Sequence, residues 1–194
     1  ESMLDTLHDD GFRVSLWEHP YVATGTPGFE TAAAEGYLIE DGTGDPYVLD
    51  DLVLDQSRGG IVDFTNPDAV SWWQGKHRDL LAMGVDAFKT DFGEDVPRDG
   101  VFASGETGAS MHNQYPNLYN EAVYDVLADV RGQDDAVTWG RSAWTGGQQY
   151  PLYWGGDPDA SFEGMASALR GGLSLSLSGF PFWGHDIGGF WGEP

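Results

Sequence analysis

The chain has 194 residues, of which 32 are acidic and 9 basic, and its formal net charge at pH 7 is −23. A charge of that sign excludes electrostatic binding of nucleic acids, which depends on a basic surface. Hydrophobic residues make up 40% of the chain and eight residues are tryptophans, a composition that excludes a disordered protein and indicates a globular one.

In chain order, residues 1–10 have the pattern of the last turns of an amphipathic helix, which Gly11 ends. Residues 13–17 predict a short strand. Residues 23–60 contain Gly, Pro and Asp throughout, and they predict a long irregular loop excursion after that strand.

The clearest helix follows Asn66, a good N-cap, with Pro67 at its first position and Gly84 as its end. The next expected elements are a strand at 85–92, a helix at 118–130, a strand at 136–142, a helix at 161–177 and a strand at 180–184. Strands and helices therefore alternate along the chain.

Alternation favours parallel strands joined by helical crossovers, either in an open doubly wound sheet or in a (β/α)8 barrel. Two observations favour the barrel. The expected strands end in polar or aromatic side chains suited to one shared pocket, and the chain has no glycine-rich nucleotide-binding motif. A complete barrel needs about 250 residues. We therefore predict an α/β fold that is a partial (β/α)8 TIM barrel.

Asp supplies most of the acidic residues, and only Lys76 and Lys89 are lysines. Salt screens dense negative charge, so we expect a surface adapted to high salt; the alternative is an ordinary acidic protein. The absence of cysteine excludes disulfides and thiolate metal sites. Residues 1–20 lack a signal-peptide pattern and no apolar run is long enough to cross a bilayer, so we expect a cytoplasmic location and no membrane partner.

Lys89 and Asp91 form the first candidate site. The two-residue period of a strand places both side chains on the same face. If that face is the mouth of the barrel, Lys89 would keep Asp91 ionised and ready for nucleophilic attack. The alternative is a structural ion pair at the end of the strand.

Asp157 is the second candidate carboxylate, because it follows Trp154 and two glycines and the indole offers it an apolar wall. An acid beside apolar surface tends to keep its proton, as a general acid must. Asp91 and Asp157 could therefore cleave a glycosidic bond together, one attacking and the other protonating the leaving oxygen. The alternative for Asp157 is a turn residue before Pro158.

The remaining predictions concern side chains other than these two carboxylates. Arg141 could bind sugar hydroxyls or fix a carboxylate, or it could form only a salt bridge. Trp17 and Trp154 could stack on sugar rings or belong to the core. His185 and Asp186 could bind a metal, but the five histidines lack zinc-type spacing, so we expect no metal site.

At these motifs the chain closely resembles glycoside hydrolase family 31, and within it the α-xylosidase branch. Residues 88–94, Phe-Lys-Thr-Asp-Phe-Gly-Glu, resemble that branch's nucleophile motif, and residues 154–157, Trp-Gly-Gly-Asp, resemble its acid/base motif. Residues 182–190 are similar to the signature that supplies a sugar-binding Asp, and residues 62–67 resemble the segment that enters the helix before the nucleophile strand. Four motifs in the family's order make coincidence implausible.

The resemblance implies that Asp91 is the nucleophile and Asp157 the acid/base. It also implies that the subsite for the non-reducing-end sugar is lined by Trp17, Lys89, Arg141, Trp154 and Asp186. Two segments depart from the family. Residues 16–21 read Leu-Trp-Glu-His-Pro-Tyr where Leu-Trp-Ile-Asn-Pro-Tyr is usual, and residues 55–56 read Asp-Gln where Trp-Gln is expected. The missing indole puts the leaving-group side of the pocket in question.

Residues 1–194 would then be part of one catalytic barrel of a larger enzyme, with the flanking domains absent. The implied reaction is retaining hydrolysis of terminal α-linked xylose from an oligosaccharide or glycoside, and it requires no cofactor. Retention predicts carboxyl groups about 5 to 5.5 Å apart.

Three alternatives stay open: an α-glucosidase of the same family, a sulfoquinovosidase, whose nucleophile motif also contains Asp-Phe-Gly-Glu, and a non-catalytic sugar-binding or inactive barrel fragment. Lys89 and Thr90 fit the α-xylosidase version of the motif better than the sulfoquinovosidase one. The full-length enzyme could form a homo-oligomer.

Overall fold

Five short parallel strands form the central row of the computed structural model, which describes residues 2–52 and 57–193. In spatial order they are β1 (Ser15–Glu18), β5 (Ala87–Thr90), β6 (Trp139–Gly140), β7 (Leu152–Trp154) and β8 (Trp183–Gly184). A parallel bridge between Phe88 and Thr138 joins β5 to β6. Among the described residues neither β1 nor β8 has a further partner, so the row does not close, which confirms the prediction of a partial barrel.

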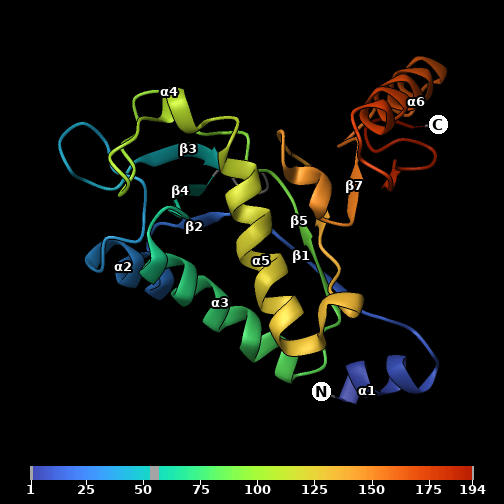
Figure 1. The fold of residues 1–194 in the computed structure, drawn as a ribbon, viewed down its shortest axis with the longest axis horizontal. Helices are drawn as coiled ribbons and strands as arrows, with labels where there is room; N and C mark the ends of the chain where they lie inside the picture. The colour runs from blue at the N-terminus through green and yellow to red at the C-terminus, as the bar shows by residue number, and fades with distance from the viewer. Residues whose placement is uncertain (1, 53–56, 194) are drawn as a thin grey trace.

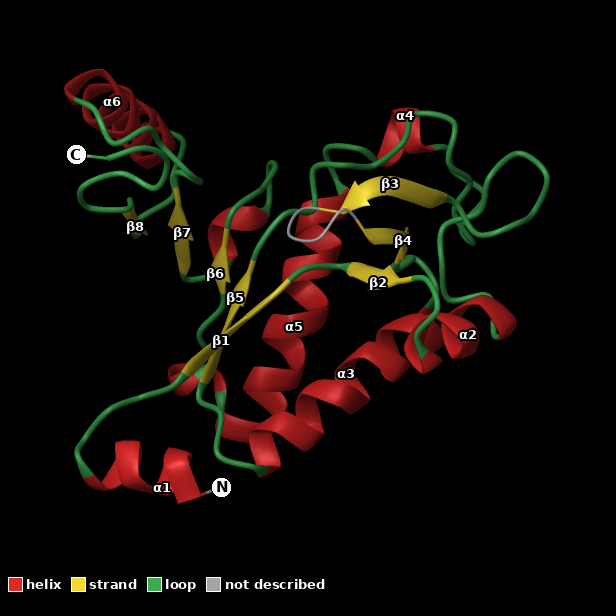
Figure 2. Cartoon of the chain, turned by 180° about the vertical axis from the view of Figure 1, so that it is seen from behind, coloured by secondary structure: helices red, strands yellow, loops and turns green. Residues whose placement is uncertain are grey.

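Two long helices, α3 (Pro67–Ala82) and α5 (Tyr115–Arg131), cover one face of this row, as Figures 1 and 2 show from opposite sides. The start of α3 is as predicted: the Asn66 side chain accepts a hydrogen bond from the backbone N–H of Asp68 at 2.9 Å. Helix α5 begins three residues earlier than predicted, because Pro116 occupies its first turn, where no N–H partner is lost.

The main core lies between the strands and these two helices. Phe88 of β5 packs there with Trp73 of α3 and with Tyr119, Val123 and Leu127 of α5, all of them buried. Burying one such side chain contributes about 1.5 to 3 kcal/mol. The core therefore holds β5 firmly against the two helices.

The segment 23–60 is not the irregular excursion that we predicted. It contains α2 (Pro27–Ala34) and two strands, β3 (Val48–Leu52) and β4 (Ser57–Ile61), which pair with β2 (Tyr21–Ala23) in an antiparallel sheet of order β2-β4-β3. Strand β4 was not predicted from the sequence, because two of its five residues are glycines, which are depleted in strands. One of them, Gly60, is required there, since a Cβ would lie 2.6 Å from Leu38. The departure at residues 55–56 lies outside the described residues.

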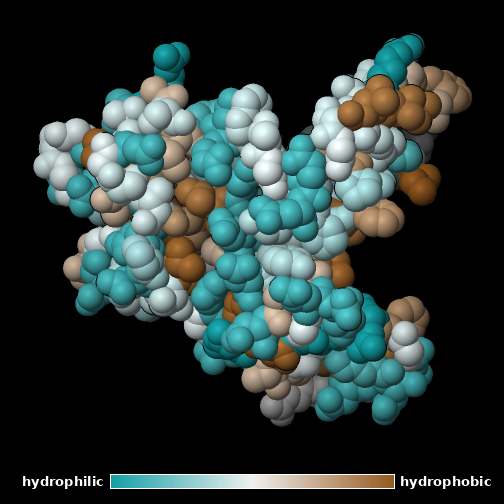
Figure 3. All heavy atoms as spheres, in the orientation of Figure 1, coloured by the Kyte–Doolittle hydropathy of each residue, from teal (hydrophilic) through white to brown (hydrophobic). Residues whose placement is uncertain are grey.

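The remaining helices lie at the edges. Helix α1 (Ser2–Asp9) matches the predicted helix end, α4 (Gly108–Met111) is one turn long, and short 3₁₀ turns occupy Gln133–Asp135 and Gly147–Gln149. Helix α6 (Phe162–Leu177) packs on Trp183 through Gly172, where a Cβ would lie 2.0 Å from the indole. The helix also carries exposed apolar side chains, which form part of the hydrophobic surface at that end in Figure 3: Phe162, Met165, Leu169, Leu173 and Leu177. No described helix is long and apolar enough to span a membrane.

Candidate active site

The carboxyl ends of four neighbouring strands carry the candidate site. Trp17 lies at the end of β1, Asp91 directly after β5, Arg141 directly after β6, and Asp157 three residues after β7. Parallel strands present their carboxyl ends at one edge. This arrangement brings together side chains that are up to 140 residues apart in the sequence. Strand β7 was not predicted from the sequence, because its three residues lie between Pro151 and a pair of glycines, which are typical of turns.

Asp91 is held by donors on both carboxylate oxygens. Its Oδ2 accepts a hydrogen bond of 2.7 Å from the Trp17 indole N–H, and its Oδ1 accepts one of 2.8 Å from the backbone N–H of Phe92. Arg141 Nη1 lies 3.1 Å from the same Oδ1, and the Asp91 side chain is only 8% exposed. Charge-assisted bonds of this kind are strong and directional, so the carboxylate is fixed in one orientation.

The backbone after Asp91 turns sharply. Phe92 has a φ of 62° and Gly93 a φ of 96°, and Phe92 is the one non-glycine with positive φ among the described residues. A side chain in that region costs about 1 to 3 kcal/mol, and such outliers cluster at functional sites. Here the turn brings the N–H of Phe92 onto Asp91 and places its ring 3.9 Å below the Arg141 guanidinium.

Arg141 contacts three carboxylates. Its Nη1 lies 3.1 Å from Asp91 Oδ1 and 3.9 Å from Asp157 Oδ2, and its Nη2 pairs with Glu94. Asp91 Oδ1 and Asp157 Oδ2 are therefore no further apart than the sum of the first two distances. That limit accommodates the spacing of retaining enzymes, about 5 to 5.5 Å, which stays a prediction. The structure shows that Arg141 pairs with carboxylates, and its proposed contact with sugar hydroxyls stays a prediction.

Lys89 does not pair with Asp91, contrary to our expectation. Its ammonium lies over two indole rings, 4.1 Å from the centre of Trp154 and 5.1 Å from that of Trp139. Cations bind the faces of such rings favourably. Trp139 was not among the predicted site residues; its one signal in the sequence is its position two residues before Arg141, on the same strand face. Arg141, from the neighbouring strand, is the cation that holds Asp91.

The two indole rings that we predicted to stack on sugar rings differ in their exposure to solvent. Trp17 is 42% exposed and open to a ligand, whereas Trp154 is 2% exposed beneath Lys89. The buried indole N–H groups of Trp139 and Trp154 have no hydrogen-bond partner among the described residues. The faces of these two indole rings hold the Lys89 ammonium.

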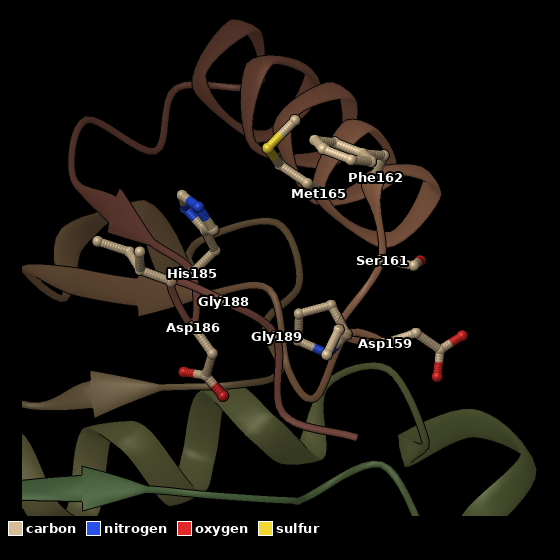
Figure 4. A pocket seen from close by; sticks show the side chains of 11 residues that line it. Asp159, Ser161, Phe162, Met165, His185, Asp186, Gly188 and Gly189 are labelled. Atoms are coloured by element: carbon tan, nitrogen blue, oxygen red, sulfur yellow. The ribbon is translucent and has the colours of Figure 1, made fainter. Parts of the chain in front are cut away.

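Asp157 and Asp186 occupy different positions relative to this cluster. The Asp157 side chain is 28% exposed and reaches Arg141. Asp186 lies two residues past β8, and its carboxylate makes no hydrogen bond or ion pair within residues 2–52 and 57–193. In Figure 4 it points away from Met165 and Phe162 of α6, which line the pocket shown there. Neither Asp91 nor Asp157 lines that pocket.

The described part of the chain contains no group of three or more His, Cys, Asp or Glu side chains that could hold a metal ion. At this site two carboxylates, those of Asp91 and Asp157, lie beside Arg141. One of them is firmly held and one is more accessible, and an arginine lies between the two. Such a pair suits nucleophilic attack combined with proton transfer.

Comparison with known proteins places the chain in a family. The model of the "Glycosyl hydrolases family 31 TIM-barrel domain" matches residues 1–194. An α-xylosidase of Emericella nidulans is 43% identical over 192 residues, covering 98% of this chain and 24% of the relative. An α-xylosidase of Lactiplantibacillus pentosus is 45% identical over 193 residues, covering 98% and 25%.

Solved structures agree with this relationship. A cycloalternan-forming enzyme from Listeria monocytogenes, solved with a pentasaccharide substrate, matches with a TM-score of 0.89 and 37% identity over 98% of this chain and 19% of that one. The chain thus spans about a quarter of the length of the curated relatives it matches.

Proposed function

Because the chain belongs to glycoside hydrolase family 31, we propose that its protein is a retaining α-xylosidase. It would release terminal α-linked xylose from the non-reducing end of an oligosaccharide or glycoside. The observation that carries the proposal is the Arg141 guanidinium, which lies 3.1 Å from Asp91 and 3.9 Å from Asp157, two carboxylates 66 residues apart in the sequence. The identity to two α-xylosidases supports the choice of sugar.

In the first step Asp91 Oδ attacks the anomeric carbon of the bound sugar. The bond to the leaving oxygen breaks, and Asp157 gives its proton to that oxygen. In the second step Asp157 takes a proton from water, and the resulting hydroxide displaces the Asp91 carboxylate and releases the sugar. The donors on Asp91 support the first role by fixing its orientation, and the 28% exposure of Asp157 supports the second by leaving it open to water.

Arg141 would stabilise the charges that change during these steps. Before attack it faces an ionised Asp91; once the glycosyl ester forms, that charge is gone and Asp157 is ionised instead. A guanidinium within 4 Å of both carboxylates can follow this transfer of negative charge without moving. Lys89 and the exposed ring of Trp17 would bind the sugar, by hydrogen bonding to hydroxyls and by stacking.

The test is a rate comparison of 4-nitrophenyl α-xyloside and α-glucoside with the full-length protein. We expect faster turnover of the xyloside, and the α-xylose released at first should show retention by NMR. Asp91→Ala should abolish hydrolysis and leave the melting temperature close to that of the unchanged protein. Near-normal rates in Asp91→Ala would reject the assigned nucleophile, and preference for the glucoside would make the protein an α-glucosidase.

We also propose that the protein works at high salt. The excess of acidic side chains, 32 against 9 basic ones, supports this proposal. Like charges at this density repel one another, and salt screens that repulsion.

A further inference from the structure

Beneath the proposed catalytic cluster lies a buried ion pair that none of the proposed steps uses. Glu18 of β1 and His77 of α3 face one another, with Glu18 Oε2 2.6 Å from His77 Nε2. Their side chains are 15% and 3% exposed. The second oxygen of Glu18 accepts a hydrogen bond of 3.3 Å from the Tyr119 hydroxyl of α5. The pair thus ties the end of β1 to both helices that cover the strand row.

His77 carries a positive charge in this position. Its Nδ1 lies 2.8 Å from the carbonyl oxygen of Trp73, which can only accept, so Nδ1 donates. Its Nε2 meets a carboxylate and also donates. Burial lowers the pKa of His77, but the charge of Glu18 and the hydrogen bond to it raise the pKa more, and the net result is above the ordinary value. The imidazolium is therefore the form that fits this site.

The surroundings of His77 contain few other titratable groups. Glu18 is the charged side chain that contacts it among the described residues, and α5 contributes Tyr119, whose pKa burial raises well above its ordinary value. Strand β5 contributes only the ring of Phe88, with its centre 4.5 Å from that of the imidazole. A change in the protonation of His77 would therefore act mainly on Glu18.

Glu18 is connected to Asp91 in two ways. Its backbone carbonyl accepts a hydrogen bond of 3.0 Å from the backbone N–H of Asp91. The residue before it, Trp17, points to the other face of β1 and donates its indole N–H to Asp91 Oδ2 at 2.7 Å. Contacts that hold Glu18 in place therefore also help to position the backbone and the carboxylate of Asp91.

A buried ion pair contributes little to stability, because desolvation of the two charges offsets their attraction, and a well-packed apolar pair often does as well. We propose that Glu18 and His77 are positioning residues, whose ion pair holds the end of β1 so that Trp17 and the backbone of Asp91 keep the carboxylate in its reactive orientation. The proposal rests on the proposed function for its catalytic consequence, but its structural part can be measured without turnover.

The chain offers a matched control. His8 of α1 and Asp86, which directly precedes β5, form another histidine–carboxylate pair, with Nε2 and Oδ2 2.8 Å apart. This pair lies near the amino ends of β1 and β5, since Asp86 also accepts a hydrogen bond from the backbone N–H of Val14. Removing that pair with His8→Gln should alter stability without reaching the carboxyl ends of β1 and β5.

The experiment combines kinetics with NMR of the full-length protein labelled with ¹⁵N-tryptophan. Glu18→Gln and His77→Gln should each lower kcat by about 10- to 100-fold with little change in KM, because misplacement of a reacting group acts on the chemical step. His8→Gln should leave kcat unchanged. In the unaltered protein the indole N–H signal of Trp17, assigned with Trp17→Phe, should show a pH-dependent step at the same midpoint as the His77 imidazole, and this step should vanish in His77→Gln. A separate step at lower pH should remain in His77→Gln, because the His19 ring centre lies 5.0 Å from that of Trp17 and burial lowers the pKa of His19.

The proposal would be overturned if the indole signal of Trp17 did not shift during the titration of His77. It would also be overturned if His8→Gln and Glu18→Gln lost kcat equally. The NMR arm needs no substrate, and its main observation, the joint titration of Trp17 and His77, is made on the protein without the Glu18 or His77 substitution. If the protein hydrolyses no glycoside at all, the proposed function fails, while the Trp17 titration still decides whether the ion pair positions the site.

Discussion

Replacing Arg141 by lysine keeps a positive charge between Asp91 and Asp157 but removes the planar fork that contacts several oxygens at once. In the structure Nη1 lies 3.1 Å from Asp91 and Nη2 pairs with Glu94. A lysine ammonium is a compact point charge and cannot make both contacts from one place. The substitution therefore tests the geometry of the guanidinium separately from its charge.

The expected loss follows from these contacts. A hydrogen bond to a charged group is worth about 1.5 to 3 kcal/mol, and we expect the lysine to lose one of the two. The Arg141 and Asp91 side chains are only 17% and 8% exposed, so solvent screens the loss of the Asp91 contact little. Glu94 is 40% exposed, so loss of its contact would cost less and lies at the low end of this range. Since about 1.4 kcal/mol corresponds to a tenfold rate change, kcat/KM should fall by about 10- to 150-fold.

The assay is kcat/KM for 4-nitrophenyl α-xyloside, measured together with the melting temperature. Arg78→Lys is the matched control, because Arg78 forms an ion pair of 2.7 Å with Asp129 and both side chains are exposed. Exposed pairs contribute about 0 to 1 kcal/mol, so this variant should behave like the unchanged protein. A loss in Arg141→Lys no larger than in Arg78→Lys would refute the reasoning.

Three further predictions concern stability. Burial alone would raise the pKa of Asp86, but hydrogen bonds from Val14 and His8 and the charge of Arg131 lower it. The contribution of Asp86 to the free energy of unfolding should therefore be present above the ordinary Asp pKa and lost as the pH falls through the lowered pKa. Urea titrations of the unchanged protein should show this loss of stability, and the Asp86→Asn variant should not show it. Asn66→Ala removes the cap of α3 and should cost about 1 kcal/mol in the same assay, whereas a cost near zero would contradict the capping role. Raising KCl from low to molar concentrations should raise the melting temperature, and a fall would count against salt adaptation.

Much of the fold could be predicted from the sequence because the signals are local. Asn66, Pro67 and the apolar stripe that follows specify α3 within a few residues of chain, and alternation of such helices with apolar runs indicates parallel strands. Segment 23–60 was predicted wrongly for the same reason. Its strands β3 and β4 are stabilised by pairing with each other and with β2, and no local pattern marks them.

The motifs around Asp91 and Asp157 are continuous in the sequence, so the residue types that gather at the carboxyl ends of the strands could be predicted without a structure. Which of these side chains meet depends on the fold. Lys89 and Asp91 are two residues apart, yet Lys89 lies over indoles from two other strands and Arg141 takes the place beside Asp91. The physical reason is that long side chains choose among partners by distance and by available charge or ring surface, and strand pairing brings those partners from distant parts of the chain.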